Sequence, residues 1–232
     1  MSYEKTTWQK GDVITAEKMN KIEDGVKSAF GFSEQLNALI DGSITEITIP
    51  ADVTKIGQGA FYGRESLESV TIHDNVTEIG NYAFKSCSAL ESIDIPDSVT
   101  EIGHGVFSSS GLKSLEYSVN AGTALCEYCY SLVSVVVGEG VTTIDSGSFN
   151  GCNALTTIDI ASTVQTLGGG ALSCENLESM TVRATTPPSG VNAAMGLVPA
   201  ACTIYVPASA VDTYKSATGW STRASYIQAI QE

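Results

Sequence analysis

The stretches Ile49–Phe61, Ile72–Phe84 and Ile95–Phe107 read IPADVTKIGQGAF, IHDNVTEIGNYAF and IPDSVTEIGHGVF. They share the pattern I-x-x-x-V-T-x-I-G-x-x-[AV]-F, and each shared position recurs after 23 residues. A fixed period of this length indicates a repeat architecture, in which each unit buries its apolar face against the next one. The sequence therefore predicts a stack of short, similar units.

A second signature, L-x-x-[VI]-x-I, lies between the Phe of one unit and the Ile of the next, first as Leu67, Val70 and Ile72. Its last two apolar positions lie two residues apart, which predicts a strand with one buried face. V-T-x-I-G predicts a second short strand, and the glycine that follows it permits a tight bend. We expect G-x-x-[AV]-F to form one helical turn that places its Phe in the core.

The repeat becomes irregular towards the C-terminus. The unit from Tyr117 to Tyr130 is degenerate, and alignment of its letters places a gap of about four residues between Tyr130 and Leu132. Later units restore the pattern, and the period stops after Val182. About six units are therefore expected.

The C-terminal segment has a different pattern. It predicts a strand at Thr203–Val206 and a helix from about Ala208 to Ala217, opened by Pro207. Apolar residues that follow the helix are available to cover the last repeat, and these are Trp220, Tyr226, Ile227 and Ile230. We expect this unit to cap the open end of the stack.

The N-terminal segment predicts an amphipathic helix that begins near Thr15. A turn is expected before it, at Gly11 and Asp12. The helix would either pack on the first repeat or self-associate as a short coiled coil. Its apolar positions fall at a spacing of three to four residues, and the candidate oligomerisation residues are Met19, Ile22, Val26 and Ala29.

These elements predict an α+β repeat solenoid with an N-terminal helix and a C-terminal capping αβ unit. The expected divisions are an attachment or oligomerisation segment at 1–43, a leucine-rich repeat solenoid at 44–183 and a cap at 184–232.

Two resemblances extend this reading. The pattern I-P-x-x-V-T-x-I-G-x-x-A-F-x-x-C-x-x-L-x-x-I resembles the BspA-like subclass of bacterial leucine-rich repeats, over about Ile44 to Val182. Residues Trp8 to Val26 resemble the W-x-x-G-D-x-I-T-A-x-x-x-N-x-I-E-x-G motif of tail-fibre and baseplate proteins of phages that infect Gram-positive bacteria. The first resemblance implies adhesion, and the second implies the attachment end of an oligomeric fibre.

Little in the sequence suggests catalysis, a cofactor or a metal. The two histidines, His73 and His104, occupy non-equivalent positions in their repeats, and we expect solvated surface roles for both. Cys126 and Cys129 form a single CxxC, with Cys129 aligned to the small buried position of Ala60. Six cysteines permit three disulfides, although buried free thiols are favoured here. A glycosidase-like carboxylate pair stays open as an alternative.

Binding is expected on the outward positions of the strands. There the side chains between core positions stack into two columns of mostly small hydroxyl and acidic groups, with no aromatic anchors. One column is Thr48, Thr71, Asp94, Glu116, Val136, Asp159 and Thr181, and the other is Glu46, Ser69, Ser92, Ser114, Ser134, Thr157 and Ser179. A solvated sheet face without a ligand is the simpler alternative.

The charge of the chain restricts its partners. A net charge of −14 argues against nucleic acid and anionic membranes, both of which need clustered Lys and Arg. No apolar stretch is long enough to span a membrane, and Met1 to Trp8 show no Sec signal. We therefore expect a phage or prophage tail component that binds a bacterial surface glycan or protein, located on the virion after lysis. The alternative is a BspA-like adhesin at the cell surface that binds host matrix protein or glycan.

Overall fold

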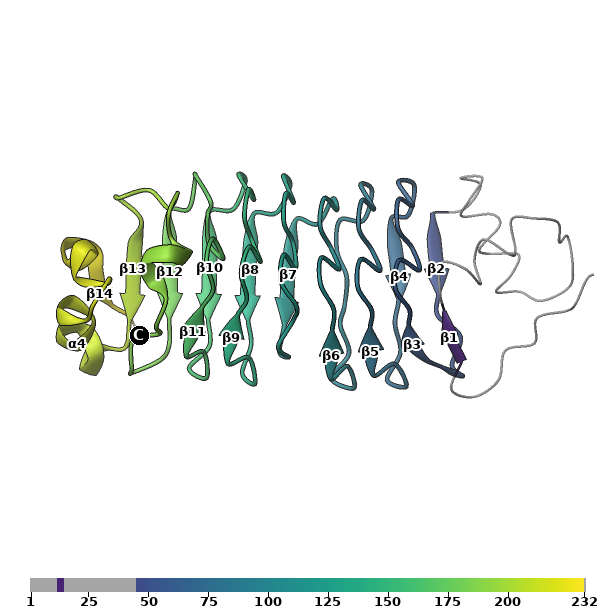
Figure 1. The fold of residues 1–232 in the computed structure, drawn as a ribbon, viewed down its shortest axis with the longest axis horizontal. Helices are drawn as coiled ribbons and strands as arrows, with labels where there is room; N and C mark the ends of the chain where they lie inside the picture. Colours follow the sequence, from purple (N-terminus) through teal and green to yellow (C-terminus); the bar gives the residue numbers. More distant parts are fainter. Residues whose placement is uncertain (1–11, 15–44, 232) are drawn as a thin grey trace, which may run out of the picture.

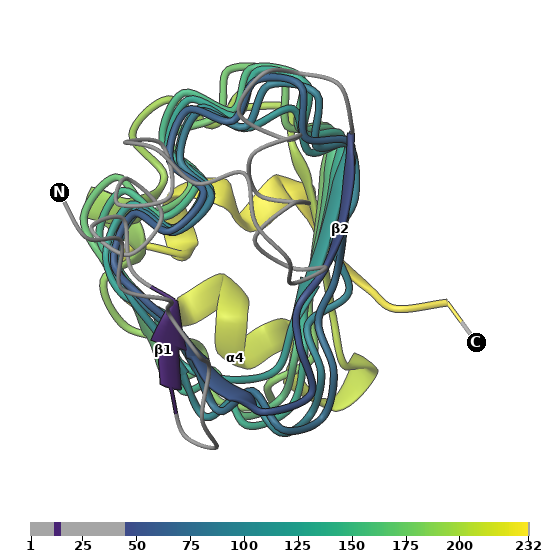
Figure 2. The same cartoon turned by 90° about the vertical axis from the view of Figure 1, so that its right-hand side faces the viewer.

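Each repeat forms one circuit of two short strand segments joined by turns, and the chain repeats this circuit along one axis (Figures 1 and 2). The structure is a computed structural model that describes residues 12–14 and 45–231. Figure 1 shows the circuits, called coils below, stacked along the long axis of the molecule. The expected N-terminal helix and its residues Met19, Ile22, Val26 and Ala29 lie outside the described residues.

One side of the coils carries the L-x-x-[VI]-x-I signature or a variant of it, and this side is called the main face. Its strands are parallel and in register, with Ile158 of one coil beside Val135 and Met180 of its neighbours. Coils 1 to 7 begin on this face at Glu46, Ser69, Ser92, Ser114, Ser134, Thr157 and Ser179. The strands are β2 (Glu46–Thr48), β4 (Ser69–Thr71), β7 (Ser114–Tyr117), β8 (Ser134–Val137), β10 (Thr157–Ile160), β12 (Ser179–Val182), β13 (Thr203–Val206) and β14 (Ile227–Ala229). The parallel strands confirm the repeat architecture.

The opposite side of the coil, called the second face, is built by the V-T-x-I segments (Figure 2). Its strands are β1 (Asp12–Ile14), β3 (Val53–Ile56), β5 (Glu78–Ile79), β6 (Glu101–Ile102), β9 (Thr143–Ile144) and β11 (Thr166–Leu167). Strand β1 is parallel to β3, with Ile14 opposite Ile56. The turn expected at Asp12 is therefore wrong, because this residue begins a strand that extends the second face by one position.

The segment after each second-face strand forms consecutive tight turns, so the expected helical turn is wrong. An α-helix needs N–H groups that bond four residues back. Here the N–H of Ala60 bonds three residues back to Gly57, and the N–H of Phe61 bonds across to Ala83 of the next coil. Residues with a left-handed backbone conformation recur along these turns in two columns. The first column holds Gly59, Tyr82, Gly105, Ala124, Gly147 and Gly170. The second column holds Gly63, Ser86, Ser109, Tyr128 and Gly151.

Gly147→Ala is expected to lower the free energy of unfolding by about 1 kcal/mol. Gly147 has φ of 68°, and a left-handed conformation is costly for a residue with a Cβ. Its added Cβ would meet no atom closer than 4.0 Å, so backbone strain is isolated from crowding. Gly169→Ala is the matched control, since its Cβ also meets open space and its φ is outside the left-handed region. Urea denaturation should show no loss, or a gain of about 0.5 kcal/mol, for the control. Equal losses for both variants would contradict the strain argument.

The core is a ladder of apolar side chains that runs through the middle of the stack. The rings of Phe61 and Phe84 are stacked with centroids 5.2 Å apart, and those of Phe84 and Phe107 are 5.8 Å apart. Cys126 follows them in the fourth coil, where its N–H bonds to the coil that carries Phe149. All of these side chains are fully buried.

Coil 4 is the shortest coil, and the residues that it lacks are missing from its turn between the two faces. In coil 5, Val137 lies seven residues before Ile144. In coil 4, Tyr117 pairs with Val137 but lies only four residues before Ala121, which bridges to Ile102 on the second face. The missing residues therefore lie between Tyr117 and Ala121, and the prediction that they are missing between Tyr130 and Leu132 is wrong.

The same register corrects the column of the CxxC pair. The N–H of Cys126 bonds to Ser148, just as the N–H of Phe84 bonds to Val106, so Cys126 occupies the phenylalanine column. Three residues later, Cys129 lies in the column of Cys87 and Cys152, and Leu125 takes the position of Ala60.

Beyond Val182 the chain makes one further coil, although the repeat letters have ended. Ser189 bridges to Thr166, and the N–H of Leu172 bonds to Ala194 of helix α3 (Val191–Ala194). The chain then forms β13 and a helical segment, close to the expected range. This segment comprises η1 (Ala208–Ala210), α4 (Val211–Ser216) and η2 (Ser221–Tyr226). Figures 1 and 2 together show α4 across the C-terminal end of the stack.

Candidate binding surfaces

The main face displays the two expected columns of outward side chains. Strand pairing places Ser114, Ser134 and Thr157 side by side in one column, and Glu116, Val136 and Asp159 in the other. Most of these side chains are exposed, because every second residue of each strand points away from the core. Thr203 and Tyr205 of β13 extend the columns beyond Ser179 and Thr181. The geometry of the columns agrees with the expectation, and their role in binding stays a prediction.

Two features make this face less uniform than a row of hydroxyl groups. Arg183 donates two hydrogen bonds to the carboxylate of Asp159, at 2.8 and 2.6 Å, and thereby neutralises it. Val136, between Glu116 and Asp159 in its column, is 40% exposed. The face therefore combines hydroxyl groups and carboxylates with an exposed apolar side chain in coil 5.

A second set of exposed side chains, called the tyrosine edge, consists of Tyr62, Tyr82, Tyr128 and Tyr130 on the tight turns of coils 1, 2 and 4. Their exposed fractions range from 41% to 65%. Tyr82 and Tyr128 have φ of 58° and 59°, in columns where other coils carry glycine. Strained backbone of this kind often accompanies functional sites. The sequence pattern did not indicate this surface, although Phe61-Tyr62 holds one aromatic residue beyond the core column and Tyr128-Cys129-Tyr130 holds two.

The tyrosine rings are grouped in two pairs. The ammonium group of Lys85 lies 5.3 Å from the ring centroid of Tyr82 and 6.0 Å from that of Tyr62. The rings of Tyr128 and Tyr130 lie 6.2 Å apart at 32°. Tyrosine supplies a large apolar area with a polar end, which suits recognition of both proteins and sugars.

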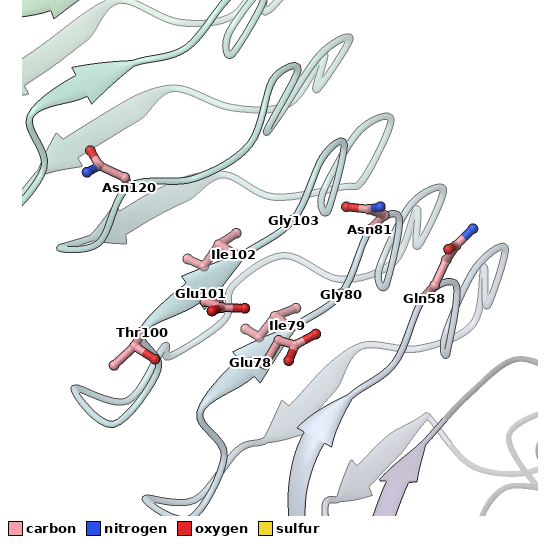
Figure 3. A pocket seen from close by; sticks show the side chains of 10 residues that line it. All are labelled: Gln58, Glu78, Ile79, Gly80, Asn81, Thr100, Glu101, Ile102, Gly103 and Asn120. Carbon is pink, nitrogen blue, oxygen red and sulfur yellow. The ribbon is translucent and has the colours of Figure 1, made fainter.

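A depression of about 410 Å³ lies on the second face over β5 and β6 (Figure 3). Glu78 and Glu101 stand opposite each other on these strands, and Asn120 of the shortened coil forms the far wall. Lys55 forms an ion pair with Glu78. The structure thus brings together a carboxylate pair that the sequence did not indicate, and Lys55 pairs with one of its members.

Both histidines make contacts between coils. Nε2 of His73 lies 2.5 Å from the carbonyl oxygen of Pro50, and Nδ1 of His104 accepts the N–H of Thr123 at 3.0 Å. His73 is half-buried and His104 is exposed. The contacts join each histidine to a neighbouring coil.

All six cysteines are free and buried, which confirms the expectation of thiols over disulfides. Four of them donate a hydrogen bond to a carbonyl oxygen of the preceding coil, as Cys87 does to Phe61 at 3.0 Å and Cys152 does to Cys126 at 2.9 Å. Burial raises the pKa of Cys87 and Cys174 to about 12, and that of Cys202 to about 11.

We expect the folded protein to react very slowly with a thiol reagent such as Ellman's reagent. The thiolate is the reactive form, and burial denies the reagent access to all six thiols. Burial also raises the pKa of Cys87, Cys174 and Cys202, whereas hydrogen bonds with Cys126 and Cys152 lower the pKa of Cys129. Six thiols per chain should react in denaturant. Rapid reaction of two or more thiols at neutral pH in the native protein would contradict the buried column.

Two further properties concern the described residues alone. Among residues 12–14 and 45–231, no group of three or more His, Cys, Asp or Glu side chains is arranged to hold a metal ion. No helix in this part of the chain is both long and apolar enough to cross a membrane.

The comparisons with known proteins agree with the geometry. The family model described as "BspA type Leucine rich repeat region" matches residues 35–124 and 122–193, with six copies. A solved leucine-rich repeat protein of T. pallidum is 31% identical, with a TM-score of 0.50, over 56% of this chain and 63% of that chain. Pneumococcal vaccine antigen PcpA, at 18% identity and a TM-score of 0.51, shows a likeness of fold alone over 82% of this chain and 42% of that chain. The chain thus spans less than two thirds of either solved chain, and no curated protein matches it.

Proposed function

Since the chain belongs to the family of BspA-type leucine-rich repeat proteins, we propose that it is a non-enzymatic binding protein that adheres to a surface glycan or protein. The observation that carries this proposal is the tyrosine edge, where four exposed rings are held outward on tight turns. The regular columns of the main face support it as a second contact area. Weak contacts that recur from coil to coil add up when a partner is itself repetitive.

The C-terminal unit is assigned the role of a cap. Trp220 and Tyr214 are buried against the last coil, and β13 and β14 continue the main sheet. An open stack would otherwise expose its core at this end. Tyr226, which was expected to join this cover, is 37% exposed, so Trp220 and Ile227 supply most of it.

The finer role that we favour is a phage or prophage tail component, located on the virion after lysis, whose repeats recognise a bacterial surface. This role rests on the motif from Trp8 to Val26, including Gly11, Asn20 and Glu23. The family match begins at residue 35 and therefore does not bear on this segment. The second candidate is a cell-surface adhesin that binds host matrix protein or glycan, and the repeats themselves favour it.

Adhesion of the full chain to Gram-positive cells, and its binding to a glycan array, tests the binding role. Replacement of Tyr62, Tyr82, Tyr128 and Tyr130 by Ala in two double variants should weaken binding roughly tenfold for each pair, as loss of aromatic anchors does. The matched control is Leu197→Ala, which removes another exposed apolar side chain. Unchanged binding by both tyrosine variants would exclude the tyrosine edge, and a Thr157→Arg variant then tests the main face.

Two measurements separate the candidate roles. Light scattering gives the mass of the full chain and of a chain that lacks residues 1–31. An oligomer that this deletion abolishes supports the fibre role through Met19, Ile22, Val26 and Ala29, whereas a monomeric full chain counts against it. Release of sugars from surface polysaccharide by the full chain would overturn the non-enzymatic proposal.

A further inference from the structure

The main sheet is interrupted between its second and fourth coils. Residues Ser92–Ile95 occupy the strand position of coil 3, yet they form no strand, and β4 and β7 belong to separate sheets (Figure 1). Within the described residues, no hydrogen bond between backbone groups involves Ser92–Ile95. Backbone N–H and C=O groups therefore stay available on this segment and on the adjoining edge of β7 (Ser114–Tyr117).

A cleft of about 820 Å³ lies along this interruption, between Ser92–Asp97 and β7. Just before this segment and β7, the N–H of Lys113 bonds to the carbonyl oxygen of Glu91 at 2.9 Å, so the two coils are joined there. The lining of the cleft continues to Ser118 and Gly138, beside the shortened turn of coil 4.

The floor and the rim of the cleft differ in polarity. Ile93 and Ile95 line the floor and are only partly buried, whereas Leu115 and Val135 on neighbouring strands are 2% exposed. The rim carries four carboxylates, from Asp94, Asp97, Glu116 and Glu139. None of the ion pairs between described residues involves these four side chains.

The rim is negatively charged at neutral pH. Hydrogen bonds from the backbone N–H and the hydroxyl group of Ser162 hold the pKa of Glu139 below its usual value. Lys113 is paired with Glu91, and Arg183, whose charge acts on Glu139, is paired with Asp159. The charge of the rim therefore selects a cationic partner.

We infer that this cleft binds an extended peptide segment of a partner protein that carries lysine or arginine side chains. The segment forms backbone hydrogen bonds with the unpaired groups of Ser92–Ile95 and β7, as in other cases where a strand is added to a sheet edge. The aliphatic stems of its basic side chains lie on Ile93 and Ile95, and their charged ends reach the rim. This inference rests on the binding role proposed above and names a partner class for one site.

The test uses the full chain and a fluorescently labelled peptide of four Lys-Val repeats with blocked ends, measured by fluorescence anisotropy at physiological ionic strength. The expected result is saturable binding of one peptide per chain, with no binding of the Glu-Val counterpart. The variant Asp94→Asn/Glu116→Gln should bind roughly tenfold more weakly, since it removes two rim charges without loss of volume. The control Glu175→Gln/Asp212→Asn changes the net charge equally at remote, exposed positions and should bind like the wild type.

Amide hydrogen exchange provides the second readout. Exchange at Ser92–Ile95 should be fast in the free protein and slower when the Lys-Val peptide is bound, because backbone pairing protects these amides. Equal weakening in the control variant, or an absence of protection, would overturn the inference. So would self-association of the chain that the peptide displaces, since the cleft would then bind a second copy. If the peptide does not bind but the chain still adheres to cells, the cleft inference fails and the binding role stands.

Discussion

Phe84→Ala is expected to lower the free energy of unfolding by about 3–5 kcal/mol. Phe84 is fully buried, and both faces of its ring are stacked, on Phe61 at 5.2 Å and on Phe107 at 5.8 Å. Neighbouring coils cannot close over the cavity, because backbone hydrogen bonds such as Phe61 to Ala83 fix their spacing. Urea or guanidinium denaturation followed by circular dichroism measures the change.

The control for this variant is Tyr62→Ala, in which an aromatic ring is lost from the same turns. Tyr62 is 53% exposed, so its replacement should change the free energy of unfolding by less than about 0.5 kcal/mol. If Phe84→Ala costs no more than Tyr62→Ala, the phenylalanine ladder does not stabilise the stack.

Trp220→Ala is expected to lower the free energy of unfolding by a similar amount, about 3–5 kcal/mol. Its ring is 1% exposed and packs edge-on against Tyr214, with centroids 5.0 Å apart. Its indole N–H donates to the carbonyl oxygen of Pro188 at 2.9 Å, and the Tyr214 hydroxyl donates to Ala184 at 2.8 Å. Removal of the indole would admit water to the end of the core.

Hydrogen exchange distinguishes the loss of a cap from general destabilisation. In Trp220→Ala, amides of β13 and β14 should exchange faster than those of β8, because the stack opens from its exposed end. Trp220→Phe retains much of the ring but loses the hydrogen bond, so a cost of about 1–2 kcal/mol is expected. Uniform acceleration across all coils would contradict the capping role.

The sequence predicted most strands because their inward positions alternate, and each apolar column is repeated several times. The strand predicted by Leu90, Ile93 and Ile95 is wrong, because Ser92–Ile95 makes no backbone pairing with other described residues. It did not predict the turns correctly. The letters G-x-x-[AV]-F fit a helical turn, but the backbone N–H of Phe61 is bonded to the next coil instead of to its own segment. Such a partner lies outside any local pattern. The strand at Asp12–Ile14 was missed for the same reason, since its pairing with β3 spans about forty residues.

The sequence pattern also failed to predict where coil 4 is shortened. Coil 4 carries Tyr117, Ala121 and Cys126 in place of the usual Ile, Ile and Phe, so no matching residues were left to align it with the other coils. The hydrogen bonds between neighbouring coils establish that alignment in the structure. The tyrosine edge was missed because outward positions in turns carry no period, and its residues are identified only by their exposure.

The interruption of the main sheet also has a consequence for how the chain folds. Repeat stacks nucleate locally and then propagate by adding one unit to the next, since most contacts join residues one period apart. Propagation through β7, β8, β10 and β12 proceeds along an unbroken ladder, whereas β2 and β4 form a separate one. The two blocks therefore have independent starting points on this face, and the rate at which they join depends on the side-chain contacts of Ile93 and Ile95 and on the second-face bridge between Ile102 and Ala121.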